Sequence, residues 1–420
     1  MWPFKRNAAG EIRTSQPYWL MRDGIGDARP RREPAGDYEI VIVGAGITGA
    51  LVADALVATG RRILMLDARE PAQGSTAAST ALLQYETDMH LVDLARRLGP
   101  ERATLAYRAG IASFAMLERR FPELLAQSGY ERRESVYLAS DTKVLATLRA
   151  ERAARAGIGI ACEWLEADEV ARRYGCQRPA ALVSALGAQI DPVRFTRGVL
   201  AGCERHGVEL HTGAVVKALE EEGETLRVML ESGTVIRARD VVICAGYESP
   251  RFLPDVAADL NNTFALVTEP VERAGAMPLM WETARPYLYV RGTPDGRLIV
   301  GGADVPFQSA VARDLLLPRQ IRRIGAAYQD LFGKELPPVA YAWAGTFAET
   351  PDGLPYIGSV PGRHPHLRFA MCYGGNGITY SINAGEIIRA GIEGRAHPLD
   401  EVFGFQRSGD GASVGKWGHS

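Results

Sequence analysis

The sequence predicts an α/β fold with two domains, one Rossmann-like and one built on an antiparallel sheet. Three observations lead to this prediction. The chain has 420 residues, more than the roughly 250–300 at which a single hydrophobic core stops growing. Residues 38–67 read as an apolar strand, a helix and a second apolar strand, which is the order of a βαβ unit. Residues 208–246 and 284–304 instead alternate apolar and polar positions between tight turns, as antiparallel strands do.

Each expected element has its own local signal. EIVIV and RILML are short apolar runs, typical of fully buried parallel strands. Asp191 caps the clearest helix, Pro192 fits its first turn and Gly207 stops it. In chain order we expect a loose polar arm over residues 1–36, a strand at 39–43, a helix at 47–59 ended by Gly60 and a strand at 62–66. Helices within 88–130, broken at Gly99-Pro100, a helix at 141–156 ended by Gly157 and the helix after Asp191 should follow. The rest of the chain should form strands over 208–246 and within 284–304, a helix from residues 374–381 to about 391, and a polar tail over 396–420.

The composition argues against several classes of protein. There are 48 basic and 50 acidic residues with a net charge of −2, so the basic field of a nucleic-acid binder is absent. The five cysteines are scattered without a CxxC pair, and the seven histidines show no metal-ligand spacing. No window approaches the ~18 apolar residues of a membrane span, and the first residues lack a signal-peptide run. We therefore expect a cytoplasmic protein with no metal site, no membrane span and no nucleic-acid partner.

A glycine-rich motif joins the first strand to the first helix. Gly44, Gly46 and Gly49 form GxGxxG between them, where glycines permit a tight turn, a close approach to a pyrophosphate and close helix packing. The start of the helix offers free N–H groups and a positive dipole end to phosphates. Asp67 ends the second strand, 21 residues after Gly46, where a carboxylate accepts hydrogen bonds from a ribose. The motif predicts an adenine dinucleotide.

Two later features favour FAD over NAD as that dinucleotide. The strand-rich segment ending in DVVICAG brings Gly246 toward the first phosphate loop, and GGNGITYS is a second glycine-rich loop that runs into a helix. The start of that helix would stabilise negative charge on a reduced flavin ring. An NAD-dependent dehydrogenase would leave both features without a role.

The chain resembles the D-amino-acid-oxidase (DAO) family of FAD-dependent oxidoreductases, closest to its gamma-glutamylputrescine oxidase and glycine oxidase group. The motifs that carry the resemblance are VGAGITG (43–49), LDARE (66–70), QGSTAASTALLQ (73–84), GAVVKAL (213–219), VVICAGYES (241–249), DGRLIVGG (295–302), TPDGLPYIG (350–358) and GGNGIT (374–379). It implies an FAD-binding Rossmann-like (glutathione-reductase-type) domain formed by residues 37–100, 185–265 and 340–395. Residues 101–184 and 266–339 would form the substrate domain.

The resemblance also implies roles for individual residues. The cofactor would be FAD bound non-covalently, because the Cys that some members use would fall at Gly345 and the 74–80 loop has no His. The expected cofactor-binding residues are Gly44, Gly46, Ile47, Thr48, Gly49, Asp67, Ala68, Gly74, Ser75, Thr76, Ser79, Thr80, Val216, Ala245, Gly246, Gly375, Asn376, Gly377, Ile378 and Thr379.

Residues 343–358 (WAGTFAETPDGLPYIG) have the Gly, Pro and Asp content of a loop and carry no Lys or Arg. By resemblance this segment lies over the flavin, and Phe347 occupies the place of an Arg that holds the substrate carboxylate in glycine oxidase. A second family Arg would fall at Gly375. The loss of both bidentate carboxylate contacts weakens the interpretation as an ordinary amino-acid oxidase.

The polar residues expected near the substrate are Glu86, Glu349, Tyr287, Tyr289 and Tyr380. Acids and aromatic faces suit a cation, so we expect an amine substrate, with Tyr289, Phe347, Glu86 and Arg291 as the candidate catalytic residues. Each has a structural alternative: Glu86 as a cap, Tyr289 and Arg291 on an exposed strand face, Phe347 in the core. Arg291 is also the candidate replacement for the missing carboxylate contact.

The expected function is oxidation of a C–N bond in an amine, with polyamine-derived amines as one candidate class, by hydride transfer to FAD. Oxygen is the expected acceptor, with a quinone or a partner flavoprotein equally consistent, and the oligomeric state is left open. The alternatives are an amino-acid oxidase or dehydrogenase of the same family, an NAD-dependent dehydrogenase, and an FAD-binding subunit that does not turn over.

Overall fold

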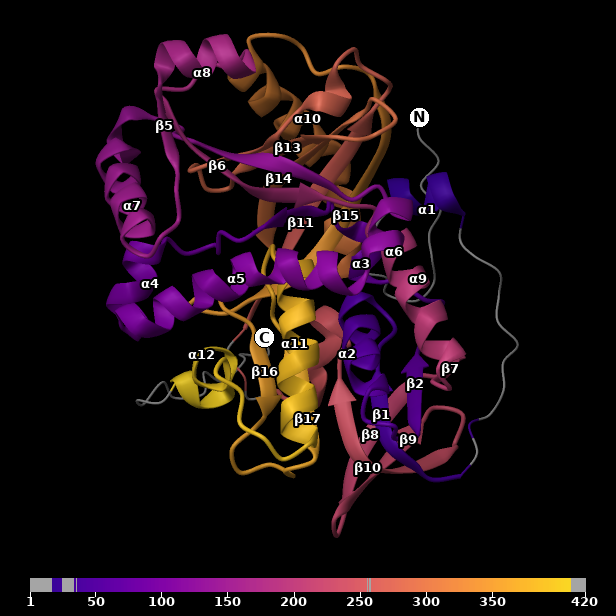
Figure 1. Cartoon of the computed structure of the whole chain (residues 1–420). Helices are drawn as coiled ribbons and strands as arrows, with labels where there is room; N and C mark the ends of the chain where they lie inside the picture. The colour runs from indigo at the N-terminus through magenta and orange to yellow at the C-terminus, as the bar shows by residue number, and fades with distance from the viewer. Residues whose placement is uncertain (1–16, 25–33, 35, 255, 257, 409–420) are drawn as a thin grey trace.

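The computed structural model describes residues 17–24, 34, 36–254, 256 and 258–408. Two sheets make up the body of the molecule, one in its lower and one in its upper half as drawn in Figure 1. The long helix α5 (Pro100–Arg120) runs between them across the front of that view.

The lower sheet contains the predicted βαβ unit. Its central strands β17, β10, β1, β2 and β7 are parallel. In antiparallel pairing, β16 joins β17, and β9 of the β8–β9 hairpin joins β10. β1 and β2 are apolar throughout their buried length, as expected for strands covered on both faces. The strands are β1 (Tyr38–Val43), β2 (Ile63–Asp67), β7 (Glu209–Thr212), β8 (Val216–Glu222), β9 (Thr225–Leu230), β10 (Val235–Ile243), β16 (Tyr356–Ser359) and β17 (Leu367–Met371).

Beside the lower sheet, α2 (Ile47–Val57) packs against both α9 (Pro192–Arg205) and α11 (Gly377–Ile392). The prediction for α9 is confirmed, since the Asp191 carboxylate accepts hydrogen bonds from the amides of Val193 (2.9 Å) and Arg194 (3.0 Å). The predictions of α2 and α11 are confirmed as well. Gly385 of α11 lies so close to α2 that a Cβ would sit 2.8 Å from the Leu51 carbonyl oxygen.

The upper sheet is antiparallel apart from the parallel pair β12–β4. Helix α10 (Ala310–Phe332) covers β11, β13, β14 and β15. The sequence analysis missed this helix, because Pro318 interrupts its apolar pattern. The strands are β3 (Leu82–Gln84), β4 (Glu131–Leu138), β5 (Glu163–Glu166), β6 (Ala180–Gln189), β11 (Asp259–Thr268), β12 (Leu279–Glu282), β13 (Leu288–Gly292), β14 (Leu298–Pro306) and β15 (Val339–Glu349).

The remaining helices are short or lie at the periphery. The helices at 91–127 and at 145–157 confirm those expected within 88–130 and 141–156. The remaining helices are α1 (Tyr18–Asp23), α3 (Ser75–Ala78), α4 (Leu91–Leu98), α6 (Pro122–Gln127), α7 (Leu145–Gly157), α8 (Ala167–Tyr174) and α12 (Asp400–Phe403), with 3₁₀ turns η1 (Thr142–Val144), η2 (Gly246–Phe252), η3 (Ala274–Ala276) and η4 (Phe405–Ser408).

The expectation of a loose N-terminal arm is wrong for residues 18–23. Helix α1 buries Trp19, whose indole N–H donates to the Ser79 carbonyl oxygen at 2.7 Å, and the Tyr18 hydroxyl donates to Asp295 at 2.7 Å. Residues 1–16, 25–33 and 35 of the expected arm lie outside the described part of the chain. Apolar and aromatic burial, which the surrounding polar sequence conceals, therefore attaches this segment to α3, α9 and the turn between β13 and β14.

The polar tail expected after residue 396 is also wrong as far as residue 408. Arg407 is buried and donates to both carboxylate oxygens of Asp352, at 2.8 and 3.1 Å, and its guanidinium lies 4.0 Å from the Tyr356 ring centroid. A buried, doubly hydrogen-bonded Arg of this kind orders the segment around it. Residues 409–420 lie outside the described part.

The first half of the 343–358 stretch is a strand, which corrects its interpretation as a loop. Residues 339–349 form β15, paired with β11 along its length, and only residues 350–355 form the connection to β16. The sequence placed β3, β15 and most of β11 in the FAD-binding domain. All three strands belong to the upper sheet. The division into domains stays a prediction.

Candidate functional site

A backbone cradle lies where β1 ends and α2 begins. Gly44 has φ +113°, and a Cβ there would lie 2.3 Å from the Cys244 carbonyl oxygen. A Cβ on Gly49 would lie 1.9 Å from the Gly44 carbonyl oxygen. Only glycine fits either position. The Ile47 amide donates to the Thr76 hydroxyl at 2.9 Å, which ties the start of α2 to α3.

Asp67 lies at the end of β2 on the wall of the same cradle. Its carboxylate accepts hydrogen bonds from the amides of Ala45 (2.6 Å) and Arg69 (2.8 Å). Burial raises the pKa of Asp67, and the two amides oppose that rise. Arg69 in turn pairs with Glu248 at 2.7 Å. Acceptor oxygens and a nearby ion pair at this end suit the hydroxyls and ring of an adenosine.

One continuous pocket, with a cavity volume of about 300 Å³, runs from this cradle to the upper sheet. The starts of α2 and α11 both border it, and neither helix is capped by the side chain of its own N-cap residue, Gly46 or Asn376. The positive ends of two helices and a glycine-lined backbone are what the diphosphate and ring of FAD require. The predicted cofactor residues that line the pocket are Gly44, Gly46, Ile47, Thr48, Asp67, Ala68, Gly74, Ser75, Thr76, Ser79, Thr80, Val216, Ala245, Gly246, Gly375, Asn376, Gly377 and Ile378.

Three predicted site residues lie away from the pocket lining. Gly49 permits close helix packing, and Thr379 is buried with its hydroxyl donating to the Asn376 carbonyl oxygen at 3.1 Å. Arg291 is also buried, and its guanidinium donates to the carbonyl oxygens of Thr80 (2.6 Å) and Ile190 (3.2 Å) and to the Gln189 side chain. Burial lowers the pKa of Arg291 to about 9. Because its donors bind the protein itself, Arg291 does not replace the missing carboxylate contact.

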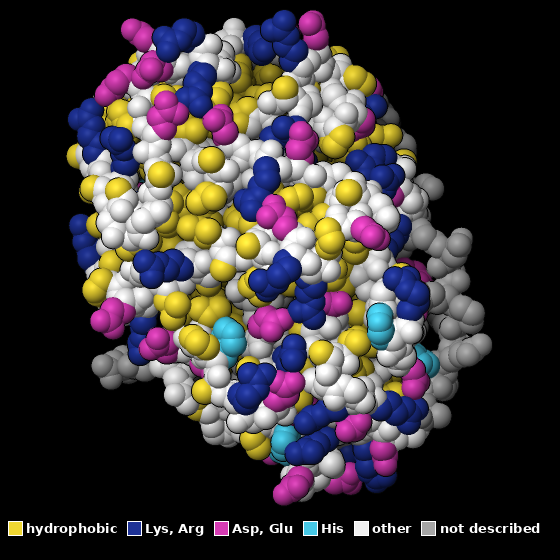
Figure 2. All heavy atoms as spheres, viewed as in Figure 1, with side chains coloured by type: hydrophobic (Ala, Val, Ile, Leu, Met, Phe, Trp, Pro, Cys, Tyr) yellow, Lys and Arg dark blue, Asp and Glu magenta, His cyan; other side chains and the backbone are white. Residues whose placement is uncertain are grey.

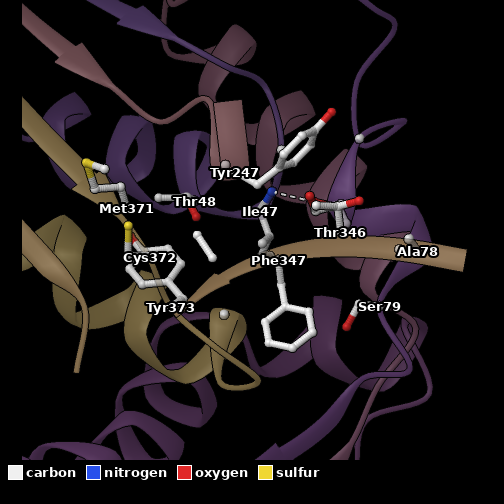
Figure 3. A pocket seen from close by; sticks show the side chains of 18 of the residues that line it. Ile47, Thr48, Ala78, Ser79, Tyr247, Thr346, Phe347, Met371, Cys372 and Tyr373 are labelled. Carbon is white, nitrogen blue, oxygen red and sulfur yellow. Dashed lines mark hydrogen bonds between the residues drawn. The ribbon is translucent and has the colours of Figure 1, made fainter. Parts of the chain in front are cut away.

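The other candidate catalytic residues meet at the far end of the pocket. Phe347 projects from β15 into the cavity, as Figure 3 shows. Glu86 and Tyr289 line it too, together with Trp281 and Tyr287. Tyr380, which the sequence placed nearby, instead packs between Tyr373 and Phe403 and does not line the pocket.

Glu86 is a buried acid with one unsatisfied oxygen. Only 3% of the residue is exposed, and its Oε1 lies 3.4 Å from Arg155 Nη1. Its Oε2 has no hydrogen-bond partner among the described residues. Burial raises the pKa of Glu86, and Arg155 opposes the rise. Arg155 is shared with Glu151, whose carboxylate accepts from the first amides of α4. Because only the Oε2 of this buried carboxylate lacks a partner, that oxygen is suited to accept a hydrogen bond from a donor on a ligand.

A second cavity of about 320 Å³ adjoins the far end of the pocket. Asp88, Tyr287, Asp304 and Phe347 border both spaces. Glu349 lines the outer cavity only, where its carboxylate accepts from Asn261 Nδ2 at 2.8 Å. We refer to this space, with the three carboxyls that line it, as the outer acidic cavity.

The three carboxyls of the outer acidic cavity oppose one another's ionisation. Burial, then the charges of Asp88 and Asp304, raises the pKa of Glu349 to about 7. Burial raises the pKa of Asp304 to about 6, and burial also raises that of Asp88. Arg285, exposed at the rim, offsets part of each shift. A bound cation would relieve both the desolvation and the repulsion.

Glu349→Gln is expected to stabilise the protein at pH 8 by about 1–2 kcal/mol after allowance for solvent screening. Glu349 binds its proton more tightly folded (pKa about 7) than at its ordinary value of 4.5. The free energy of unfolding therefore falls as pH rises from about 4.5 to 7, and the deficit is complete above pH 7. Glutamine keeps the Asn261 hydrogen bond without the charge. Denaturant unfolding at pH 5 and pH 8 checks this.

The gain should be much smaller at pH 5, where wild-type Glu349 is largely protonated in the folded protein. The matched control is Glu335→Gln, an exposed glutamate, which should leave stability unchanged at both values. An equal gain at pH 5 and pH 8 would show that the charge of Glu349 carries no penalty.

The sequence analysis missed several residues at the substrate end. Asp88 stands two positions after Glu86, and this short spacing was its only signal. Asp304, Trp281 and Arg285 carry no motif, and they reach the site because β14, β12 and the turn before β13 converge there.

Comparisons with known proteins agree with this geometry. The sequence model of the DAO family, described as FAD dependent oxidoreductase, matches residues 39–390. The chain is 25% identical to glycine oxidase of Bacillus licheniformis, over 88% of this chain and 96% of that one. It is 26% identical to D-amino acid dehydrogenase of Paramagnetospirillum magneticum, over 85% and 95%. The structure of glycine oxidase from Geobacillus kaustophilus superposes with a TM-score of 0.69 at 19% identity, covering 88% of this chain and 98% of that chain.

The family match also decides between the two dinucleotides, so the alternative of an NAD-dependent dehydrogenase is wrong. With a match over most of its length and a pocket that suits the cofactor, the chain belongs to the DAO family and is an FAD-dependent oxidoreductase.

Proposed function

We propose that the enzyme oxidises a C–N bond of an amine, with polyamine-derived compounds as the favoured class and O₂ as the electron acceptor. The observation that carries the proposal is the sign of charge at the substrate end. Glu86, Asp88 and Asp304 line that end of the pocket, whereas its basic lining residues, Arg69 and Arg251, lie beside Glu248 and Val216 at the adenosine end.

The carboxyls favour a cationic substrate in two ways. Their charges attract an ammonium group into a space from which water is largely excluded. Their raised pKa values also make them better proton acceptors near neutral pH than ordinary carboxylates. An amine must lose its proton before it gives up a hydride from the adjacent carbon, and Glu86, with its unsatisfied Oε2, is placed to take it.

The aromatic residues shape the same space. Tyr137 stacks on Trp281 with ring centroids 3.7 Å apart, and Tyr287 lies edge-on to Trp281 at 6.5 Å. Tyr289 donates to or accepts from the Thr263 hydroxyl at 3.2 Å, which holds its ring against the cavity. Such walls orient an alkyl chain and attract a cation through their ring faces.

FAD, when bound, supplies the two-electron acceptor that takes the hydride from the carbon next to nitrogen. The chain's own residues bind the amine, accept its proton and exclude water from the reacting carbon. The oxidised product is an imine, which hydrolyses with one water molecule to a carbonyl compound and a released amine. The outer acidic cavity would hold a second basic group of a longer substrate.

Three further parts of the proposal rest on the sequence. We infer that FAD is bound non-covalently, because Gly345 lines the pocket where some family members carry a Cys. A cytoplasmic location also stays a prediction. The roles of the candidate catalytic residues are also part of the proposal.

A second candidate is oxidation of an amino acid, and Arg285 favours it. This residue lines the outer acidic cavity, is exposed at its rim and lies 4.7 Å from the Tyr287 ring centroid. Its guanidinium would hold a carboxylate at a distance from the reacting carbon. Glycine oxidase and D-amino acid dehydrogenase among the relatives point the same way.

The experiment that separates the two candidates is anaerobic mixing of the yellow holoenzyme with single compounds, followed by flavin absorbance. Butylamine, butane-1,4-diamine and its N-acyl derivative are expected to bleach the flavin, and glycine and D-alanine are not. Dithionite provides the control that the flavin is reducible. Bleaching by the amino acids alone would overturn the proposal in favour of the second candidate.

A further inference from the structure

Helix α10 presents an apolar pair to solvent on the outer face of the upper sheet. Val311 is 69% exposed and Leu315 is 77% exposed, the highest values among the exposed large hydrophobic residues of the described chain. The two lie four residues apart, so they stand on one face of the helix in successive turns. Such exposure costs free energy in water unless a partner covers it.

The same face continues with positive charge. Arg319 and Arg322 follow Leu315 by four and seven residues, and both are exposed, as is Arg323 beside them. In the described part of the chain these three arginines have no ion pair, whereas the acids of α10 are already engaged: Asp314 with Arg313 at 3.0 Å and Asp330 with Arg178 at 2.9 Å. We call Val311, Leu315, Arg319, Arg322 and Arg323 the α10 stripe.

The opposite face of α10 keeps the stripe turned outward. Leu317, Ile324 and Tyr328 are buried against the upper sheet. Arg313 Nη1 donates to the Thr346 hydroxyl at 3.2 Å, and Gln320 Nε2 donates to the Ala303 carbonyl oxygen at 2.9 Å. Rotation that would hide Leu315 would expose these groups, so the stripe is a permanent feature of the surface.

The start of the stripe lies close in sequence to the outer acidic cavity. Val305 and Pro306 line the outer acidic cavity, and α10 begins at Ala310, four residues after Pro306. On the face that Figure 2 shows, basic, acidic and hydrophobic side chains are interspersed.

We propose that the α10 stripe docks the enzyme on an anionic phospholipid surface. Apolar side chains followed by unpaired arginines on one helix face are the pattern of a helix that lies in a membrane interface, with the apolar residues among acyl chains and the arginines on headgroup phosphates. No helix of the described residues is long and apolar enough to cross a bilayer, so the attachment would be peripheral. Charge complementarity favours lipid phosphate over a second copy of this chain, because two copies would bring like-charged arginines together.

The test is co-sedimentation of the holoenzyme with vesicles of phosphatidylcholine alone and of phosphatidylcholine mixed equally with phosphatidylglycerol. Binding is expected to the mixed vesicles only and should fall as salt is raised. The double variant Arg319→Gln/Arg322→Gln should bind roughly 25-fold more weakly, at about fivefold for each arginine. Leu315→Ser should weaken binding without changing its dependence on salt.

Two matched variants control for general changes. Val235→Ser removes another exposed apolar residue, on β10, and Arg108→Gln removes an exposed arginine on α5. Both should bind like the parent enzyme. Flavin absorbance should be the same for all four variants as for the parent, because none of the changed residues lines the FAD pocket or the outer acidic cavity. Failure of the parent to bind mixed vesicles would overturn the proposal, as would equal losses in test and control variants. Loss of a dimer in Leu315→Ser without any vesicle binding would assign the stripe to a second copy.

Discussion

Gly44→Ala is expected to give a protein that carries no FAD and has no yellow colour. The alanine Cβ would lie 2.3 Å from the Cys244 carbonyl oxygen and 2.8 Å from its carbonyl carbon. Neither group is the end of a flexible side chain, so β10 and the start of α2 would have to separate. The φ of +113° adds strain for any residue with a Cβ. Displacement of this turn would remove the amide groups that face the phosphates.

The measurement is the ratio of flavin to protein absorbance after purification, with circular dichroism to show whether the apoprotein folds. Gly60→Ala is the matched control, because Gly60 also has a positive φ, of +66°, but a Cβ there meets nothing within 4 Å. It should lose about 1 kcal/mol of stability at most and keep its FAD. Full flavin content in Gly44→Ala would contradict the assignment of this turn to the cofactor.

Phe347→Arg is expected to lower kcat/KM for amines by about 10²-fold and to raise it for compounds with a carboxylate next to the amine. Phe347 borders both the pocket and the outer acidic cavity. A guanidinium there would pair with Asp88, Asp304 or an incoming carboxylate, and like charge would repel an ammonium group at a cost of several kcal/mol. The ratio of the two kcat/KM values measures the change in preference.

Phe347→Leu is the control, since it removes the ring and keeps the apolar character. It should reduce activity toward both classes of substrate without changing their ratio. If Phe347→Arg left the ratio unchanged as well, the acidic character of this end would not decide the substrate. The pH dependence of amine turnover adds an internal check, because activity should rise as Glu349 ionises near pH 7.

The cofactor end of the site was predictable because its signals are local. Gly44, Gly46 and Asp67 lie on one βαβ unit, where strand, turn and helix are adjacent in sequence, and backbone geometry dictates which positions must be glycine. The second glycine-rich loop was recognisable for the same reason: residues 374–379 run directly into α11. The sequence alone thus predicted the family and the cofactor, and most of the cofactor-binding residues that it named line one pocket.

The substrate end depended on tertiary structure. Arg291 has the same charge as a carboxylate-binding arginine, but Thr80 and the adjacent pair Gln189 and Ile190 occupy its donors with backbone and side-chain oxygens. Asp88, Asp304 and Glu349 are far apart in the chain, and only the convergence of β14, β15 and the segment after β3 places them around one cavity. Burial and mutual repulsion, which raise their pKa values, exist only once they meet. The sequence could predict the cofactor end of the pocket because that information is local. Only folding decided the charge and solvation of the substrate end, because these depend on residues brought together from distant parts of the chain.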